Sequence, residues 1–186
     1  MIVYKGFDRN MCCTQGKGIY QYEIGRTEIA EKSKTRSTGF HVSENPVECL
    51  SWYPWDGKNI ICRCEAGGSI DEENSDVVCC TELTPVQMLT DVGLAVAILT
   101  YIYDHPKREC RINSRRVSVG GEKAAAGPDG IAIARGSHPR AKAGKNGIIG
   151  FILEKNGAIE RVRMFRVGRE IKENRWHQLN EEGDLV

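Results

Sequence analysis

Eight cysteines are the first residues of this 186-residue chain whose types and spacing could do chemistry. They are Cys12, Cys13, Cys49, Cys62, Cys64, Cys79, Cys80 and Cys110. Zinc-binding cysteines usually form C-x₂₋₄-C pairs, whereas the close pairs here are adjacent or separated by a single residue. In the stretch 60–66, period-two alternation places Cys62 and Cys64 on the same face as Ile60 and Ala66, as for buried thiols. We predict reduced structural cysteines; a metal cluster and disulfides are the alternatives.

His41 is the histidine most similar to a functional one, because it precedes the expected start of a helix. Together with Lys5 it could bind a phosphate, while the alternative is that its ring bonds nearby backbone and orders the turn. His105, His138 and His177 have no acid in a triad-like context, so nothing indicates nucleophilic catalysis. We therefore expect no catalytic residues, no metal ligands and no cofactor.

Two stretches are rich in basic residues although the chain carries a net charge of only +1, which argues against a uniformly basic nucleic-acid binder. The stretch 107–116 ends in Arg115 and Arg116, and the stretch 135–145 has no acid. Alternating outward positions would bring four cations of the second stretch to one side, namely Arg135, Arg140, Lys142 and Lys145. Such a strip could follow a phosphate backbone or an acidic protein face; ordinary solvated charge is the alternative. The acidic loop 71–76 could imitate nucleic-acid charge or simply aid solubility.

The elements that would position these residues begin with strands at 2–7 and 19–24, then a short strand and helix within 36–53. Asn45 is the expected N-cap of that helix, Pro46 its first residue and Glu48 its capping-box acid. Strands follow at 59–66, where Gly67 and Gly68 end the pattern, and at 77–83. A long helix is predicted from Thr84, as N-cap before Pro85, to about Tyr103.

From about residue 111, short alternating segments end near glycines. Their apolar pairs are Val117/Val119, Ala124/Ala126, Ile131/Ile133 and Ala141/Ala143. This spacing favours a short parallel β-solenoid, closed by a strand at 158–167 and by Trp176 as a cap. The predicted fold class is α+β: an N-terminal mixed unit with one long helix at 1–110, then a β-solenoid-like region at 111–186.

The chain starts directly in a strand-like pattern, and the apolar run from Val92 to Tyr103 is too short for a bilayer of about 30 Å. We therefore expect no membrane segment and a cytoplasmic protein; the oligomeric state is left open.

Several blocks resemble a family of uncharacterised phage and prophage proteins. They are Tyr4-Lys-Gly-Phe-Asp8, Tyr22-Glu-Ile-Gly25, Gly39-Phe-His-Val-Ser-Glu-Asn-Pro46, Cys64-Glu-Ala-Gly-Gly68 and Cys80-Thr-Glu-Leu83, followed by alanine- and glycine-rich turns. The resemblance implies a mobile-element setting and a two-part fold. More weakly, residues 4–53 resemble ADP-ribosyltransferase-type folds. That resemblance places Lys5 on the first strand and Ser37-Thr38 beneath the nicotinamide ribose, with Glu65 and Glu82 as candidates for the glutamate.

Three functions are compatible with these observations. The favoured one is a non-catalytic phage accessory protein that acts in the cytoplasm of the host bacterium. It would bind a host protein or ribonucleoprotein and inhibit a defence machine, such as a CRISPR nuclease of the Cas9 type. Nucleic acid could take part through the basic strip. The alternatives are an NAD-binding, possibly degenerate relative of ADP-ribosyltransferases, and a structural virion protein.

Overall fold

The computed structural model describes residues 1–13, 18–34, 37–72, 77–169 and 171–186. Two compact units make up the chain: an N-terminal unit, Met1–Thr90, and a C-terminal unit, Asp91–Val186. Arg36 and residues 73–76 of the acidic loop expected at 71–76 lie outside the described residues.

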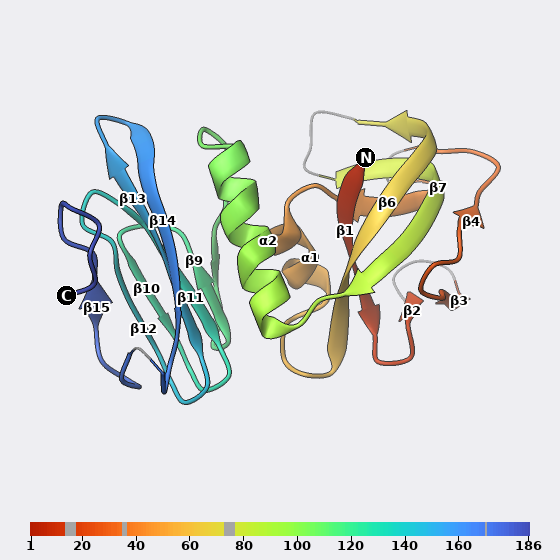
Figure 1. Cartoon of the computed structure of the whole chain (residues 1–186). Coiled ribbons are helices and arrows are strands. Elements are labelled where there is room, and N and C mark those ends of the chain that lie inside the picture. The colour runs from red at the N-terminus through yellow and green to blue at the C-terminus, as the bar shows by residue number, and fades with distance from the viewer. Residues whose placement is uncertain (14–17, 35–36, 73–76, 170) are drawn as a thin grey trace. The chain divides into compact units, whose positions relative to one another are not determined.

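The N-terminal unit is a small closed barrel. Its elements are β1 (Ile2–Asp8), β2 (Cys12–Cys13), β3 (Tyr20–Gln21), β4 (Glu28–Ile29), β5 (Phe40–Ser43), α1 (Pro46–Trp52), β6 (Asn59–Asp71) and β7 (Val77–Met88). Strand β7 pairs with β5, β5 with β1, β1 with β6, and β6 again with β7, so that four antiparallel strands close on themselves. Figure 1 shows β6 and β7 as the long curved strands of this barrel.

The barrel core is assembled by alternation along its strands. Val3 and Phe7 of β1 are fully buried beside Cys62 and Cys64 of β6, and Ala66 joins the same cluster. Small thiols occupy the positions that narrow barrels fill with small side chains. The prediction that Cys62 and Cys64 share a buried face with Ala66 is confirmed.

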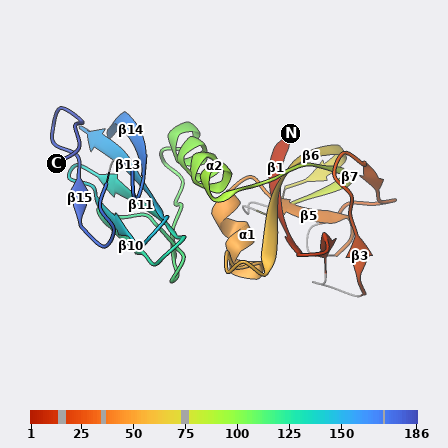
Figure 2. The ribbon, with the colours of Figure 1, turned by 60° about the horizontal axis from the view of Figure 1, so that its bottom comes forward.

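Helix α1 begins where the sequence indicates. The Asn45 side chain accepts a hydrogen bond from the Val47 amide at 3.0 Å, and Pro46 occupies the first turn. The helix ends at Trp52 before Pro54, and it packs on β1 and β5 (Figure 2). The predicted strand and the short helix with its Asn45 cap are therefore confirmed. The Asn45 amide donates to the Ser43 hydroxyl at 3.1 Å, and the capping-box role of Glu48 stays a prediction.

The long helix predicted from Thr84 is wrong in its first part. Residues 84–88 continue β7 and pair with β6, in a ladder where Pro85 lies opposite Cys64 beside a register shift. A bulge is one of the few places where a strand tolerates proline. The Thr84 hydroxyl lies 2.8 Å from that of Thr27 instead of capping a helix. The helix, α2, begins only at Asp91 and ends at Asp104.

The C-terminal unit contains α2 and two sheets. Its strands are β8 (Ile112–Asn113), β9 (Val117–Val119), β10 (Lys123–Ala126), β11 (Ile131–Gly136), β12 (Arg140–Ala143), β13 (Ile148–Lys155), β14 (Ala158–Arg166) and β15 (His177–Gln178). One sheet has the order β14-β13-β11-β9-β8 and the other β10-β12-β15. Parallel pairs join β9 to β11, β11 to β13 and β10 to β12.

The two sheets bury alanines between them. Ala124, Ala132, Ala134, Ala141 and Ala143 form one cluster with larger side chains of β13 and of the C-terminal segment. The opposite face of β11 and β13 meets α2 (Figure 1). Gly150 marks the close approach, because a Cβ there would lie 3.3 Å from a methyl carbon of Leu99.

The α+β fold class, with its long helix followed by a solenoid-like region, is therefore wrong. Strands account for 49% of the described residues and helical residues for 12%, and the N-terminal unit is a closed barrel. In the C-terminal unit, antiparallel β8, β14 and β15 flank the parallel strands, so the region is a pair of mixed sheets. Likewise, Gly67 and Gly68 do not end β6, which passes through them with a register shift.

Candidate functional site

A pocket of about 840 Å³ lies in the N-terminal unit. Its walls come from β1, β5, α1 and the segment from Tyr20 to Ala30. The volume lies within the range of about 300–1,000 Å³ typical of small-molecule sites, and the lining is mainly apolar and aromatic. Both binding residues predicted in this unit, Lys5 and His41, line it.

Lys5 lies on the core-facing side of β1, between Val3 and Phe7, and is only 7% exposed. Its ammonium donates a hydrogen bond to the backbone carbonyl of His41 at 2.8 Å. It also lies 5.9 Å from the ring centroid of Phe7 and 5.7 Å from that of Tyr22. Buried lysines are rare unless they are paired, and an ammonium in this position is suited to pair with an anionic group in the pocket.

His41 is half-buried at the centre of β5, opposite Cys79 of β7. Burial, and next the nearby Lys5 charge, lowers the pKa of its imidazole below the usual 6.5. The ring is therefore neutral at pH 7. Its Nε2 is buried and has no hydrogen-bond partner within the described part of the chain. Since a buried polar atom without a partner costs about 1–3 kcal/mol, a ligand that bonds Nε2 would recover that energy.

Aromatic rings form one wall of the pocket. The Tyr20 and Tyr22 ring centroids lie 4.8 Å apart, and each ring also contacts Phe40, at 5.8 and 6.0 Å respectively. Trp52, on the last turn of α1, lines the pocket and is 63% exposed. Such rings accept a flat ligand ring by stacking or by edge-to-face contact.

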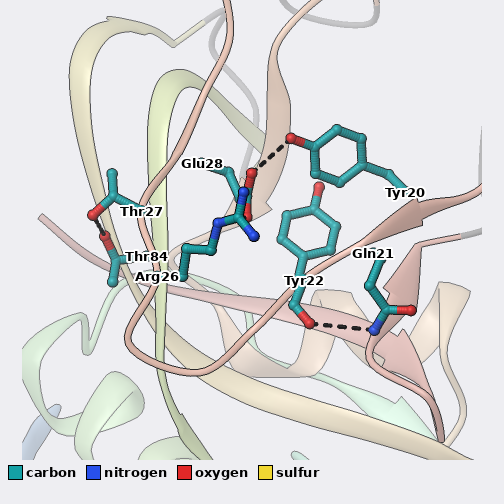
Figure 3. A network of polar contacts seen from close by, with 7 residues as sticks. All are labelled: Tyr20, Gln21, Tyr22, Arg26, Thr27, Glu28 and Thr84. Atoms are coloured by element: carbon teal, nitrogen blue, oxygen red, sulfur yellow. Dashed lines mark hydrogen bonds and ion pairs between the residues drawn. The ribbon is translucent and has the colours of Figure 1, made fainter.

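A polar network holds the Tyr20 side chain, and Tyr22 lies beside it (Figure 3). The Tyr20 hydroxyl donates to Glu28 Oε2 at 2.8 Å, and Arg26 forms an ion pair with Glu28 at 3.2 Å. The hydrogen bond to Glu28 raises the pKa of Tyr20, and burial raises the pKa of Tyr22. Both phenols are thus neutral at pH 7 and present hydroxyl groups rather than charges.

The Cys49 thiol at the pocket is a poor nucleophile. Burial raises the pKa of Cys49 to about 12, although Lys5 acts in the opposite direction. The Cys13 sulfur accepts a hydrogen bond from the Tyr53 hydroxyl at 3.4 Å. Because the thiolate is the reactive form, a protonated Cys49 contributes apolar surface to the pocket and not covalent chemistry.

The residues that the ADP-ribosyltransferase resemblance implies are not brought together. Ser37 and Thr38 are exposed in a turn before β5, held by an isolated bridge between Thr38 and Lys34. Glu65 and Glu82 are exposed on β6 and β7. None of these four residues lines the pocket that contains Lys5.

The cations predicted to form one strip in the C-terminal unit do not all lie on the same sheet. Arg135 extends from β11 and forms an ion pair with Glu154 of β13 at 2.6 Å. Arg140 and Lys142 lie on β12 in the other sheet. Lys145 and Arg115 are exposed in loops, and Arg116 is half-buried beside β9. The structure therefore groups Arg140 with Lys142 but does not add Arg135 to them.

Sequence reasoning missed the aromatic contributors. The sequence predicts Tyr20 and Tyr22 as strand residues, with Tyr22 also in a block of the family resemblance, and Trp176 as a cap; it does not predict an aromatic binding surface. Their i, i+2 spacing was the available signal for Tyr20 and Tyr22, because it places both rings on one side of an extended segment. For Trp176, which follows the strands it contacts by more than thirty residues, the sequence offers no local signal.

The eight cysteines are free thiols, and seven of them are buried. Among the described residues, no group of three or more histidine, cysteine or acidic side chains is placed to bind a metal ion. No helix in the described ranges is long and apolar enough to cross a membrane.

Comparison with known proteins gives one match. A family model described as a domain of unknown function (DUF7666) matches residues 1–97, which include the whole barrel and its pocket. Neither the curated proteins nor the solved structures contain a match to this chain.

Proposed function

The chain belongs to the DUF7666 family, and we propose that its N-terminal unit is a non-catalytic binding module for a ligand of nucleotide size. The ligand would carry a flat ring and an anionic group. The observation that carries this proposal is the 840 Å³ pocket whose lining includes both Lys5 and His41, together with the buried Nε2 of His41, which has no hydrogen-bond partner within the described part of the chain.

Three groups of residues in the pocket each contact a different part of the ligand. The ring of the ligand packs against the cluster formed by Tyr20, Tyr22 and Phe40. The Lys5 ammonium attracts the anionic group. Neutral His41 hydrogen-bonds a polar atom of the ligand, and such a bond discriminates against analogues that lack that atom.

NAD is the first ligand to test, because the resemblance to ADP-ribosyltransferase-type folds concerns residues of the same unit. Ser37, Thr38 and both candidate glutamates lie outside the pocket, so we propose binding without turnover. In this proposal Lys5 is retained as an anion anchor.

Calorimetry with NAD, ADP-ribose and AMP tests the proposal. We expect binding to the intact protein, with loss of about tenfold or more in affinity for His41→Ala, the size expected for a buried hydrogen bond. Trp52→Ala should weaken binding, whereas Trp55→Ala, a tryptophan that does not line the pocket, should not. Equal effects of the two tryptophan changes, or absence of binding by all three ligands, would contradict the proposal.

A second candidate concerns the biological setting. We propose that the protein is a phage or mobile-element accessory protein that binds a host defence complex, such as a CRISPR nuclease. Its support is the resemblance of residues 4–83 to phage and prophage proteins. The grouping of Arg140 and Lys142 on one strand adds a surface suited to an anionic partner.

Tagged pull-down from host lysate, with and without nuclease treatment, tests this candidate. A stoichiometric complex that resists nuclease would support binding to a host protein. A virion-enriched protein with no host partner would instead favour the structural alternative.

A further inference from the structure

The outer face of the β10-β12-β15 sheet carries a group of cations. Ala124, Ala126, Ala141 and Ala143 face inward, so the residues that alternate with them face outward. Lys123 pairs in register with Arg140, and Ala125 with Lys142. We call Lys123, Arg140, Lys142 and Trp176 the cationic face. Residues two apart on a strand are about 6.6 Å apart and neighbouring strands about 4.8 Å apart, so the three charges are close together.

Trp176 gives this face an aromatic surface. The Lys142 ammonium lies 4.9 Å from the Trp176 ring centroid, and the Arg140 guanidinium lies 5.7 Å from it. Cation–π contacts of this kind order both long side chains and the ring. The tryptophan is nevertheless 41% exposed, so part of the indole remains open to solvent.

A cleft of about 500 Å³ adjoins the cationic face. Trp176 and Lys123 form part of its lining, together with Arg111, Asn113 and Ser118. The Nε atom of Arg140 is buried and has no hydrogen-bond partner among the residues that the structure describes. Arg140 does not itself line the cleft, but its register partner Lys123 does, and a guanidinium with an unused donor is suited to an anionic oxygen.

The nearby acids do not neutralise this face. No ion pair joins Lys123, Arg140 or Lys142 to an acid in the described ranges. Glu122 is engaged elsewhere: the Ser137 hydroxyl donates to it at 3.0 Å and the His138 amide at 3.2 Å. Arg111 pairs with Glu109 at 3.2 Å, but both side chains are largely exposed, so this pair is easily exchanged.

We propose that the cationic face binds a single strand of nucleic acid. A base stacks on the open part of Trp176, while phosphates contact Lys123, Arg140 and Lys142, and the strand continues into the cleft beside Arg111. Proteins that bind single strands combine a positive groove with aromatic side chains in this way. A duplex fits less well, because its base faces are stacked inside the helix and cannot reach the indole.

Fluorescence anisotropy of labelled twelve-nucleotide dT and rU strands tests the inference on the full chain. We expect binding that weakens with salt, and Lys142→Gln or Lys123→Gln should each reduce the salt slope by about 0.7. Trp176→Ala should weaken binding by roughly fivefold or more at constant salt. Circular dichroism establishes whether each variant is folded.

Arg163→Gln is the matched control, since it removes one exposed positive charge from β14 in the other sheet. It should leave affinity within about twofold, because Arg163 lies outside the cationic face. Four results would overturn the inference. The first three are no binding at low salt, equal loss for Arg163→Gln and Lys142→Gln, and equal affinity for a duplex of the same length. Displacement of the strand by polyglutamate at equal charge would also overturn it, because it would indicate a general polyanion surface or an acidic protein partner.

Discussion

Gly6→Ala tests how tightly α1 is fixed against the barrel beside the pocket. A Cβ at position 6 would lie 2.4, 2.5 and 2.6 Å from the Cδ2, Cγ and Cβ atoms of Tyr53. Rotation of the Tyr53 side chain could relieve the first two contacts. It cannot relieve the third, because the Cβ of Tyr53 moves only with the backbone at the end of α1.

The size of the effect follows from that geometry. Ordinary contact begins at 3.4 Å, so the backbone of β1 or of the end of α1 must move by about 0.8 Å. Overpacking of a fixed site costs about 1–3 kcal/mol. With a urea dependence of about 1–3 kcal/mol/M, the unfolding midpoint of the N-terminal unit should fall by roughly 1 M.

Urea unfolding followed by tryptophan fluorescence measures this change. A Trp176→Phe background limits the signal to Trp52 and Trp55 in the N-terminal unit. Gly67→Ala is the control, because a Cβ there meets only Glu82, at 3.2 Å from the end of its flexible side chain. Gly67→Ala should change stability by no more than about 0.5 kcal/mol. If Gly6→Ala is as stable as Gly67→Ala, the close packing of Tyr53 on β1 is refuted.

Three further predictions follow from the same unit. Asn45→Ala should cost about 1–2 kcal/mol in urea unfolding because the Val47 amide loses its acceptor, whereas Asn45→Asp should retain most of that energy; equal losses would exclude the cap. The pKa of His41 is lowered in the folded state, so the unfolded chain binds the extra proton. Stability should therefore fall as pH drops below about 6.5, and His41→Gln should remove that part of the pH dependence; an unchanged profile would contradict it. Burial raises the pKa values of Cys62 to about 12 and of Cys80 to about 11, so a thiol reagent at pH 7.5 should label them only after unfolding; rapid native labelling of either residue would contradict their burial.

Local signals predicted the best-defined elements of the N-terminal unit. Asn45 and Pro46 determine where α1 begins without help from the rest of the chain, and alternation located Cys62 and Cys64 in the core. The prediction failed at Thr84-Pro85, where the same residue types that start a helix occur in a bulged strand. The pairing of 84–88 with β6 decided between the two, and pairing partners are not visible in a local pattern.

In the candidate site, too, local residue types were predictable and contacts between distant segments were not. Lys5 and His41 were identified from their residue types and their place in the chain, and both line the pocket. The aromatic wall brings together residues that are distant in the sequence and become neighbours only in the fold. The same is true of the contact of Trp176 with Arg140 and Lys142. Barrel closure between β6 and β7 creates the pocket-bearing unit, and it results from long-range pairing that no segment encodes alone.

The most direct test of the pocket proposal is an NMR titration of the imidazole nitrogens. The chain has four histidines, so the Nε2 resonance of His41 can be assigned with a His41→Gln variant. On addition of NAD, ADP-ribose or AMP, we predict that this resonance shifts saturably while those of His105, His138 and His177 remain in place. If His41 Nε2 is unchanged by all three ligands, or if the four histidines shift together, the pocket does not bind its ligand as proposed.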